Sequence, residues 1–170
     1  MRRLFFIGTL AIVLLGSFLL TLWFTDMGPS TSKDARPGSE QLADRKVSDY
    51  SELSRVASDL GLTLSRRMQG ALDGAERIGE RDVRYWGWLA DPDGDATPLK
   101  IVVFVAGRAV TTAQTTGERA DVTRLLGLAF GAEKNVAFEV KFSCRAGEVH
   151  VVVGLGTRKQ YFPFPARPCP

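Results

Sequence analysis

An uncharged run of 21 residues, from Leu4 to Phe24, constrains this chain more than any other part of its sequence. As a helix rising about 1.5 Å per residue, the run would be about 31 Å long, which matches a bilayer's hydrocarbon core of about 30 Å. Arg2 and Arg3 precede it, and the positive-inside rule then places the N-terminus in the cytoplasm. We therefore expect residues 1–25 to form a cytoplasmic tip and a single transmembrane anchor, with the bilayer as its partner.

A cleaved signal peptide is the alternative interpretation of this run. Signal peptides usually have apolar regions of about 7 to 15 residues, followed by a cleavage site of the small-x-small type. The run here is longer and no A-x-A pattern follows Phe24, although a cut near Ser30 or Ser32 stays open. The sequence favours an uncleaved anchor, which leaves the remaining residues on the far side of the membrane.

The composition is that of an ordinary folded domain. Of 170 residues, 45% are hydrophobic and 24% are charged, so one domain is expected beyond the anchor. The 22 Lys and Arg residues nearly balance the 19 Asp and Glu residues, which argues against nucleic acid as a partner. Arg accounts for 16 of the basic residues, which favours a GC-rich bacterium. The expected address is the bacterial inner membrane, with the C-terminal domain in the periplasm.

The next two segments are predicted to be a linker and a helix. Residues 26–47 are rich in Gly, Pro, Ser and charged side chains, as flexible linkers are. In residues 48–78 apolar residues recur in steps of three and four, which predicts an amphipathic helix with Ser48 as its N-cap. Gly70 and Gly74 weaken its second half. The apolar stripe would pack on the following domain or, alternatively, pair with a second copy of the chain.

Residues 79–170 change to an apolar period of two, which predicts β-strands. Two of these strands cover residues 83–89 and 99–105, and Ala106-Gly107 forms a two-residue hairpin turn after the second. Residues 121–130 are predicted to form a short helix with Asp121 as its N-cap. The expected fold is mainly β, a small sandwich of about five or six strands of immunoglobulin-like size.

The last strands are predicted to form a hairpin through Ala146-Gly147. Its register pairs Cys144 with Val149 and Ser143 with His150. Cys144 then faces the core and His150 faces the opposite side. The apolar face of this hairpin would hold Phe138, Phe142, Val149, Val151, Val153 and Leu155.

The two cysteines are expected to pair with each other. An even number of cysteines in a domain outside the cytoplasm favours a disulfide between Cys144 and Cys169. A catalytic pair of Cys144 and His150 would need hydrogen-bond reach, which the predicted hairpin register denies. The chain has one His, so it lacks the multi-His sets of catalytic zinc sites.

Three aspartates are weak candidates for metal ligands. Asp91, Asp93 and Asp95 alternate as at the start of a calcium loop, but the Gly and Glu positions of an EF-hand do not match. Asp, Pro and Gly also make ordinary tight turns. No cofactor is expected.

Trp86 and Trp88 are candidates for a binding surface. They share one face of the strand at residues 83–89, opposite Val83, Tyr85 and Leu89. Exposed indoles could stack on sugar rings or anchor a partner protein. The alternative, which is commoner in sandwiches, is that they fill the core.

Residues 87–122 contain three short motifs: G-W-x-x-D at the start, V-F-V-x-G-R in the middle and R-x-D-V at the end. This run resembles an immunoglobulin-like β-sandwich module of bacterial envelope proteins. The resemblance implies a sandwich fold and no activity. Such modules usually have Asp or Asn before the hairpin Gly, where this chain has Ala106, whereas Arg119 and Asp121 match the last motif.

Taken together, the sequence predicts a membrane-anchored, extracytoplasmic sandwich that binds or scaffolds without catalysis. Another envelope protein is a candidate partner, and the oligomeric state is not indicated. The alternatives are a hydrolase acting on cell-wall or lipid substrates, which needs acidic residues that converge in a cleft, and an accessory subunit of a membrane complex.

Overall fold

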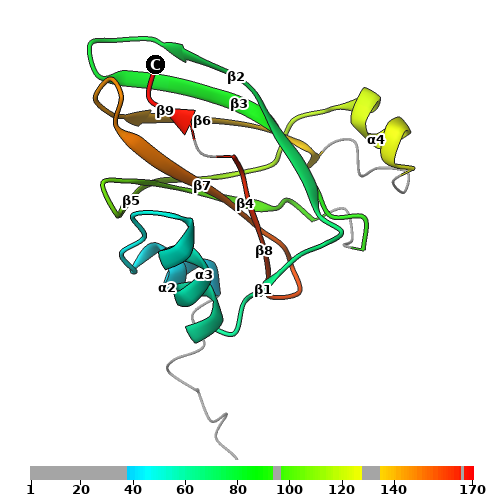
Figure 1. Cartoon of the computed structure of the whole chain (residues 1–170). Coiled ribbons are helices and arrows are strands. Elements are labelled where there is room, and N and C mark those ends of the chain that lie inside the picture. The colour runs from blue at the N-terminus through cyan, green and yellow to red at the C-terminus, as the bar shows by residue number, and fades with distance from the viewer. Residues whose placement is uncertain (1–37, 94–96, 128–134, 166) are drawn as a thin grey trace, which may run out of the picture. The chain divides into compact units, whose positions relative to one another are not determined.

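Two β-sheets pack face to face, and helices cover the outer face of the larger one (Figure 1). The structure is a computed structural model that describes residues 38–93, 97–127, 135–165 and 167–170. The elements in chain order are α2 (Gly38–Ala43), α3 (Tyr50–Asp59), β1 (Thr63–Leu64), β2 (Gln69–Arg77), β3 (Asp82–Ala90), β4 (Lys100–Val105), β5 (Arg108–Gln114), α4 (Ala120–Leu126), β6 (Ala137–Ser143), β7 (Val149–Leu155), β8 (Gln160–Pro163) and β9 (Arg167–Pro168).

The larger sheet has the strand order β1-β8-β7-β4-β5, and β9 also pairs with β7. The smaller sheet has the order β2-β3-β6, with antiparallel pairing throughout. The core between the sheets is made of inward-facing residues from both: Leu72, Val83, Tyr85, Leu89, Ile101, Val103, Phe138, Val140, Phe142, Val152 and Phe164. The chain is therefore mainly β with two packed sheets, the class that the sequence predicted.

The hairpin of β4 and β5 is confirmed. Val105 pairs with Arg108, so Ala106 and Gly107 form the two-residue turn, with φ of 50° and 79°. A positive φ at both positions is the type I′ geometry that matches strand twist. Ala106 accepts this backbone although it lacks the Asn or Asp usual at its position.

The predicted helix over residues 48–78 is wrong in its second half, because α3 ends at Asp59 and residues 69–77 form β2. A β-bulge between Leu72 and Gly74 explains the misleading pattern. The extra residue places Leu72 opposite Gly87 and Ala75 opposite Tyr85, so two inward positions lie three residues apart, as on a helix. The N-cap is Asp49 rather than Ser48, since the Asp49 carboxylate accepts a hydrogen bond from the Glu52 amide at 2.8 Å.

Part of the predicted linker is folded. Residues 38–47 contain α2 and two fully buried side chains, Leu42 and Val47. The Val47 amide donates to the Gly107 carbonyl at 2.9 Å. These residues and α3 cover the outer face of the larger sheet, so the domain begins well before residue 79. Residues 26–37 lie outside the described part of the chain.

The predicted hairpin of β6 and β7 is also wrong. A turn does occur at Ala146-Gly147, but β6 pairs with β3 in the smaller sheet and β7 pairs with β4 in the larger one. Strand β7 lies in a different sheet from β6 because β7 is apolar on both faces. One face of β7 packs on the smaller sheet, and the other packs on the helices. A hairpin with β6 would bury one of them only.

No helix in the described part of the chain has the length and apolar character that crossing a bilayer requires. The predicted anchor, Leu4 to Phe24, lies outside that part.

Candidate binding surface

The outer face of the smaller sheet carries the two tryptophans that the sequence singled out. On β3, Val83, Tyr85 and Leu89 are buried in the core, while Trp86 and Trp88 are half-buried on the opposite face. The shared face of the two indoles is thus confirmed. The structure does not place them between the sheets, which was the alternative.

Trp86 lies over the backbone of β2. A Cβ at Gly74 would come within 2.2 Å of Cζ2 of the Trp86 ring, so this position accepts no side chain while the indole stays in place. The Arg84 guanidinium carbon lies 5.6 Å from the centre of the Trp86 ring, within cation-π range. The indole is therefore held by its neighbours.

Acidic residues on both neighbouring strands contact Arg84. Its guanidinium pairs with Glu76 on β2 and lies 3.8 Å from a carboxylate oxygen of Glu139 on β6. Lys141 Nζ lies 3.3 Å from the second Glu139 oxygen. These contacts run across all three strands and keep Arg84 beside Trp86.

A cavity of about 480 Å³ opens next to Trp86. The described residues that line it are Arg84, Trp86, Thr116, Gly117, Ala137, Phe138 and Glu139. The amides of Thr116 and Gly117 both donate to the Ala137 carbonyl, at 2.9 and 3.0 Å, so the segment after β5 forms a wall against β6. The cavity combines an aromatic ring, a cation, a carboxylate and a hydroxyl.

Trp88 lies in a different environment from Trp86. It packs against a small apolar cluster of Ala90, Val122 and Val136, together with Leu126. Val122 and Leu126 belong to α4, so Trp88 docks this helix onto the end of the smaller sheet. The two tryptophans therefore have separate roles: Trp86 lines the cavity, and Trp88 supports α4.

Arg119 ties the start of α4 to β2. Its guanidinium donates two hydrogen bonds of 2.8 Å to Asp121 and a further one to Asp73, the bulged residue of β2. Arg119 lowers the pKa of the Asp121 carboxyl to about 2, mainly through the hydrogen bonds. The prediction that Asp121 is the N-cap is wrong. The helix begins at Ala120, and its N-cap residue is Arg119, whose side chain makes no capping hydrogen bond.

Of the three candidate metal ligands, Asp91 and Asp93 lie in a turn where each has another partner. Asp91 is buried, and its Oδ1 accepts a hydrogen bond of 3.1 Å from the Asp93 amide, as in an ordinary turn. Asp93 pairs with Arg67 at 2.8 Å, and Asp95 lies outside the described residues. No cluster of three or more metal-ligating side chains occurs among the residues that the structure describes.

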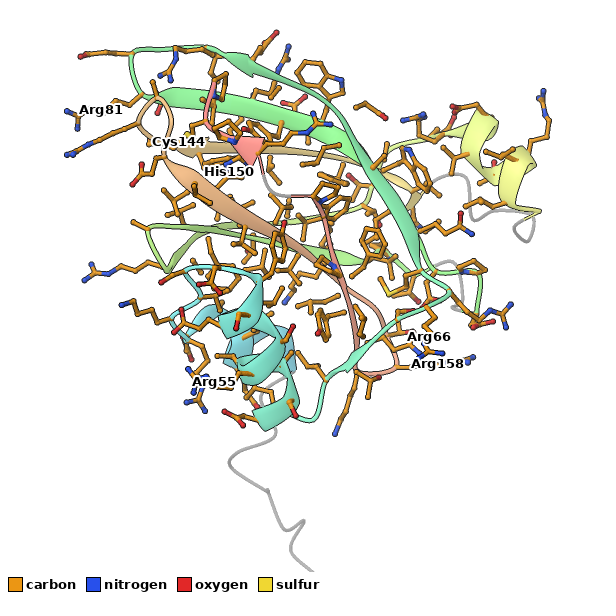
Figure 2. The ribbon with its side chains drawn as sticks, in the orientation of Figure 1. Arg55, Arg66, Arg81, Cys144, His150 and Arg158 are labelled. Atoms are coloured by element: carbon orange, nitrogen blue, oxygen red, sulfur yellow. A yellow bond between two sulfur atoms is a disulfide. The ribbon has the colours of Figure 1, made fainter. Side chains whose placement is uncertain are left out.

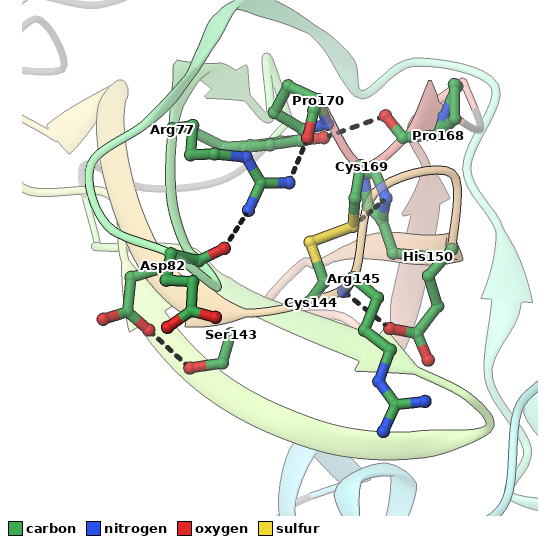
Figure 3. The surroundings of a disulfide bond; sticks show 12 residues. Arg77, Asp82, Ser143, Cys144, Arg145, His150, Pro168, Cys169 and Pro170 are labelled. Atoms are coloured by element: carbon green, nitrogen blue, oxygen red, sulfur yellow. Dashed lines mark hydrogen bonds between the residues drawn. A yellow bond between two sulfur atoms is a disulfide. The ribbon is translucent and has the colours of Figure 1, made fainter.

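The two cysteine sulfurs lie at bonding distance, 2.06 Å, which joins Cys144 to Cys169 as the sequence predicted (Figure 3). The disulfide ties the end of β6 to the tail after β9, and Arg77 donates to the carbonyl of the final residue, Pro170. The tail is thus fastened across the sandwich.

His150 is 1% exposed, although the predicted hairpin register places it on the side opposite the core. Because β7 pairs with β4 and not with β6, the face of β7 that carries His150 points toward the smaller sheet. The His150 ring contacts Tyr85 edge-to-face, with ring centres 4.8 Å apart. Both His150 and Cys144 therefore lie between the sheets. The disulfide occupies both thiols, so neither serves as a nucleophile in this state.

Sequence reasoning missed Arg84, Glu139 and Thr116. For Arg84 and Glu139 the sequence did hold a signal, since both lie on the polar face of strands in which apolar and polar residues alternate. These residues become neighbours only through the strand order, because Trp86 pairs with Glu139, which is more than 50 positions away in the sequence.

Comparison of the chain with family models, with curated proteins and with solved structures found no match.

Proposed function

We propose that this chain is a membrane-anchored binding protein of the bacterial envelope, with its sandwich in the periplasm, and that the cavity beside Trp86 holds a sugar ring of an envelope glycan. One observation carries the proposal: a half-buried indole lines a cavity of about 480 Å³ together with Arg84, Glu139 and Thr116. Ligand cavities commonly have volumes of about 300 to 1,000 Å³.

The chemistry of the lining suits a carbohydrate. An indole offers a flat apolar surface on which the C–H face of a sugar ring can stack. Sugar hydroxyls both donate and accept hydrogen bonds, and here Arg84 can donate, Glu139 can accept and Thr116 can do both. Because Trp86 is held in place by Gly74 and Arg84, little side-chain freedom is lost when a ligand binds.

Two observations support binding over the alternatives. Glycoside hydrolysis usually requires a pair of carboxylates, and Glu139 is the only carboxylate among the described residues that line this cavity. An accessory subunit that docks through its helix would need an exposed apolar stripe. The stripe of α3, Leu53, Val56 and Ala57, is buried against the domain's own sheet.

The periplasmic location is supported by the uncharged run from Leu4 to Phe24 and by the cysteine pair, since disulfides persist in oxidising compartments. Protease added to intact spheroplasts should remove the sandwich and leave the anchor. If the sandwich survives in spheroplasts and is digested only after lysis, the proposed topology is wrong.

Sugar binding is tested by calorimetric titration of the full chain, in neutral detergent, with oligomers of N-acetylglucosamine and with solubilised cell-wall glycan. We expect Trp86→Ala to weaken binding at least tenfold, about 1.4 kcal/mol, because the stacking surface is lost. Leu125→Ala is the matched control, since this side chain is 81% exposed on the neighbouring α4 and does not line the cavity. Wild-type protein that binds none of these glycans would overturn the assignment.

A further inference from the structure

A second cavity opens at one end of the larger sheet, with a lining unlike that of the Trp86 cavity. Its volume is about 380 Å³, and its rim includes Lys100 and Lys159 together with the amide side chains of Gln114 and Gln160. No acidic side chain is among the described residues that line it. The lining therefore includes two ammonium groups and two side-chain amides, which can donate hydrogen bonds to a ligand.

The same cavity has an apolar wall. Leu62 and Leu155 line it, and both side chains belong to the buried cluster between the helices and the larger sheet. A small inorganic anion would gain no favourable contact from this apolar surface. An amphipathic ligand, with an anionic group beside hydrocarbon, matches both parts of the lining.

Lys159 has an unusual backbone conformation. Its φ is 54°, in the left-handed region that Gly or Asn usually occupies in a turn. The Lys159 carbonyl accepts a hydrogen bond of 2.9 Å from the Thr63 amide, which holds the turn between β7 and β8 in place. A non-Gly residue with a positive φ is uncommon, and here that position carries a long cationic side chain.

More cations lie at this end of the molecule. Figure 2 shows Arg66 and Arg158 at the same corner, where β1 and the turn after β7 meet. The β1–β8 pairing accounts for this: the Ser65 amide bonds to the Tyr161 carbonyl at 2.9 Å, and Arg66 and Arg158 flank the paired residues. Arg158 lies in sequence between Thr157 and Lys159, which both line the cavity.

We infer that this cavity binds the phosphate group of an anionic lipid headgroup, with the adjoining glycerol and acyl carbons against Leu62 and Leu155. The inference rests on the proposed membrane anchor. Gly38 lines the cavity, and the 13 residues of segment 25–37 separate it from the end of the uncharged run. A chain of this length spans at most about 45 Å.

The experiment uses the full chain in neutral detergent, with phosphatidylglycerol or phosphatidylcholine added in equal amounts. Native mass spectrometry measures how many lipids of each kind stay bound. We expect wild-type protein to retain phosphatidylglycerol at least threefold over phosphatidylcholine. A variant with Arg158→Gln and Lys159→Gln should lose most of this preference. A control with Arg81→Gln and Arg145→Gln, which removes two exposed cations near the disulfide, should keep it.

The variants separate this site from the anchor, because Arg2 and Arg3 attract anionic lipid equally in all of them. A preference that is unchanged in the Arg158 and Lys159 variant would overturn the inference. So would displacement of the lipid by millimolar inorganic phosphate, which would assign the cavity to the free anion. The detergent measurement does not depend on topology or on sugar binding, so its failure is distinguishable from failure of the proposed function.

Discussion

The imidazole Nδ1 of His150 lies 3.7 Å from Sγ of Cys169, in the space between the two sheets. Tyr85 meets the ring edge-to-face at 4.8 Å, and Phe142 lies 5.7 Å from it. Burial in these surroundings lowers the pKa of His150, and the nearby charge of Arg167 lowers it further. At neutral pH this lowered pKa favours the neutral imidazole in the folded protein.

This burial predicts a pH-dependent stability. Because the pKa of His150 is lower in the folded state, the unfolded state takes up the proton first as the pH falls below about 6.5, and the free energy of unfolding decreases. Urea unfolding of the full chain in detergent should show lower stability at pH 5 than at pH 7.5. His150→Leu should flatten this difference. An equal slope in both proteins would contradict the assignment.

Gly74→Ala should displace the Trp86 indole. The added Cβ would come within 2.2 Å of the ring, and such overpacking costs about 1 to 3 kcal/mol. We expect a red-shifted tryptophan emission, lower stability and weaker sugar binding. Gly79→Ala is the control, because its Cβ would come no closer than 3.3 Å to the Asp82 side chain. Unchanged emission in Gly74→Ala would show that the indole is not held as described.

Removal of the disulfide should destabilise the domain. The two cysteines are 25 positions apart, and closing a loop of this length stabilises a fold by about 3 kcal/mol in the chain-entropy model. Cys144→Ser with Cys169→Ser should lower the thermal midpoint, and reduced wild-type protein should behave alike. Mass spectrometry after alkylation without reductant checks the bridge directly, since two alkylated thiols in protein from its native compartment would exclude it.

Lys159→Gly should separate stability from lipid binding. Gly relieves the left-handed conformation, so we expect the free energy of unfolding to rise by about 0.5 to 1 kcal/mol. The same variant should retain less phosphatidylglycerol. Thr157→Gly, in the same turn without a positive φ, should gain no stability. Denaturant titration together with lipid retention checks both effects, and a loss of stability in Lys159→Gly would contradict the account of this turn.

Local patterns predicted some elements of the sandwich. The alternation along residues 83–89 and the Ala106-Gly107 turn depend on neighbouring residues only, so strand β3 and the first hairpin were predictable. The cysteine pairing followed from their number and the expected compartment. None of these needs knowledge of strand order.

The errors arose where distant contacts override local patterns. The bulge at Asp73 changes the strand period from two to three, so β2 imitates a helix in sequence. Strand β7 is apolar on both faces, which a one-sided hairpin cannot satisfy, and its inclusion in the larger sheet buried His150. Both outcomes depend on packing against segments far away in the chain.

The candidate site was predictable in part for the same reason. The face of Trp86 followed from alternation along one strand. The cavity did not, because its wall at Thr116 reaches β6 only through the hydrogen bonds to Ala137. The different environments of Trp86 and Trp88 could not be predicted either, because they depend on where α4 packs.

The segment Thr115–Gly117 leaves the larger sheet after β5 and bonds to Ala137 at the start of β6 in the smaller sheet. A ligand bound between Thr116 and Trp86 would therefore contact both sheets where they meet and would link them. Bound ligand should then raise the force needed to separate the two sheets, and it should slow hydrogen exchange of the amides between them.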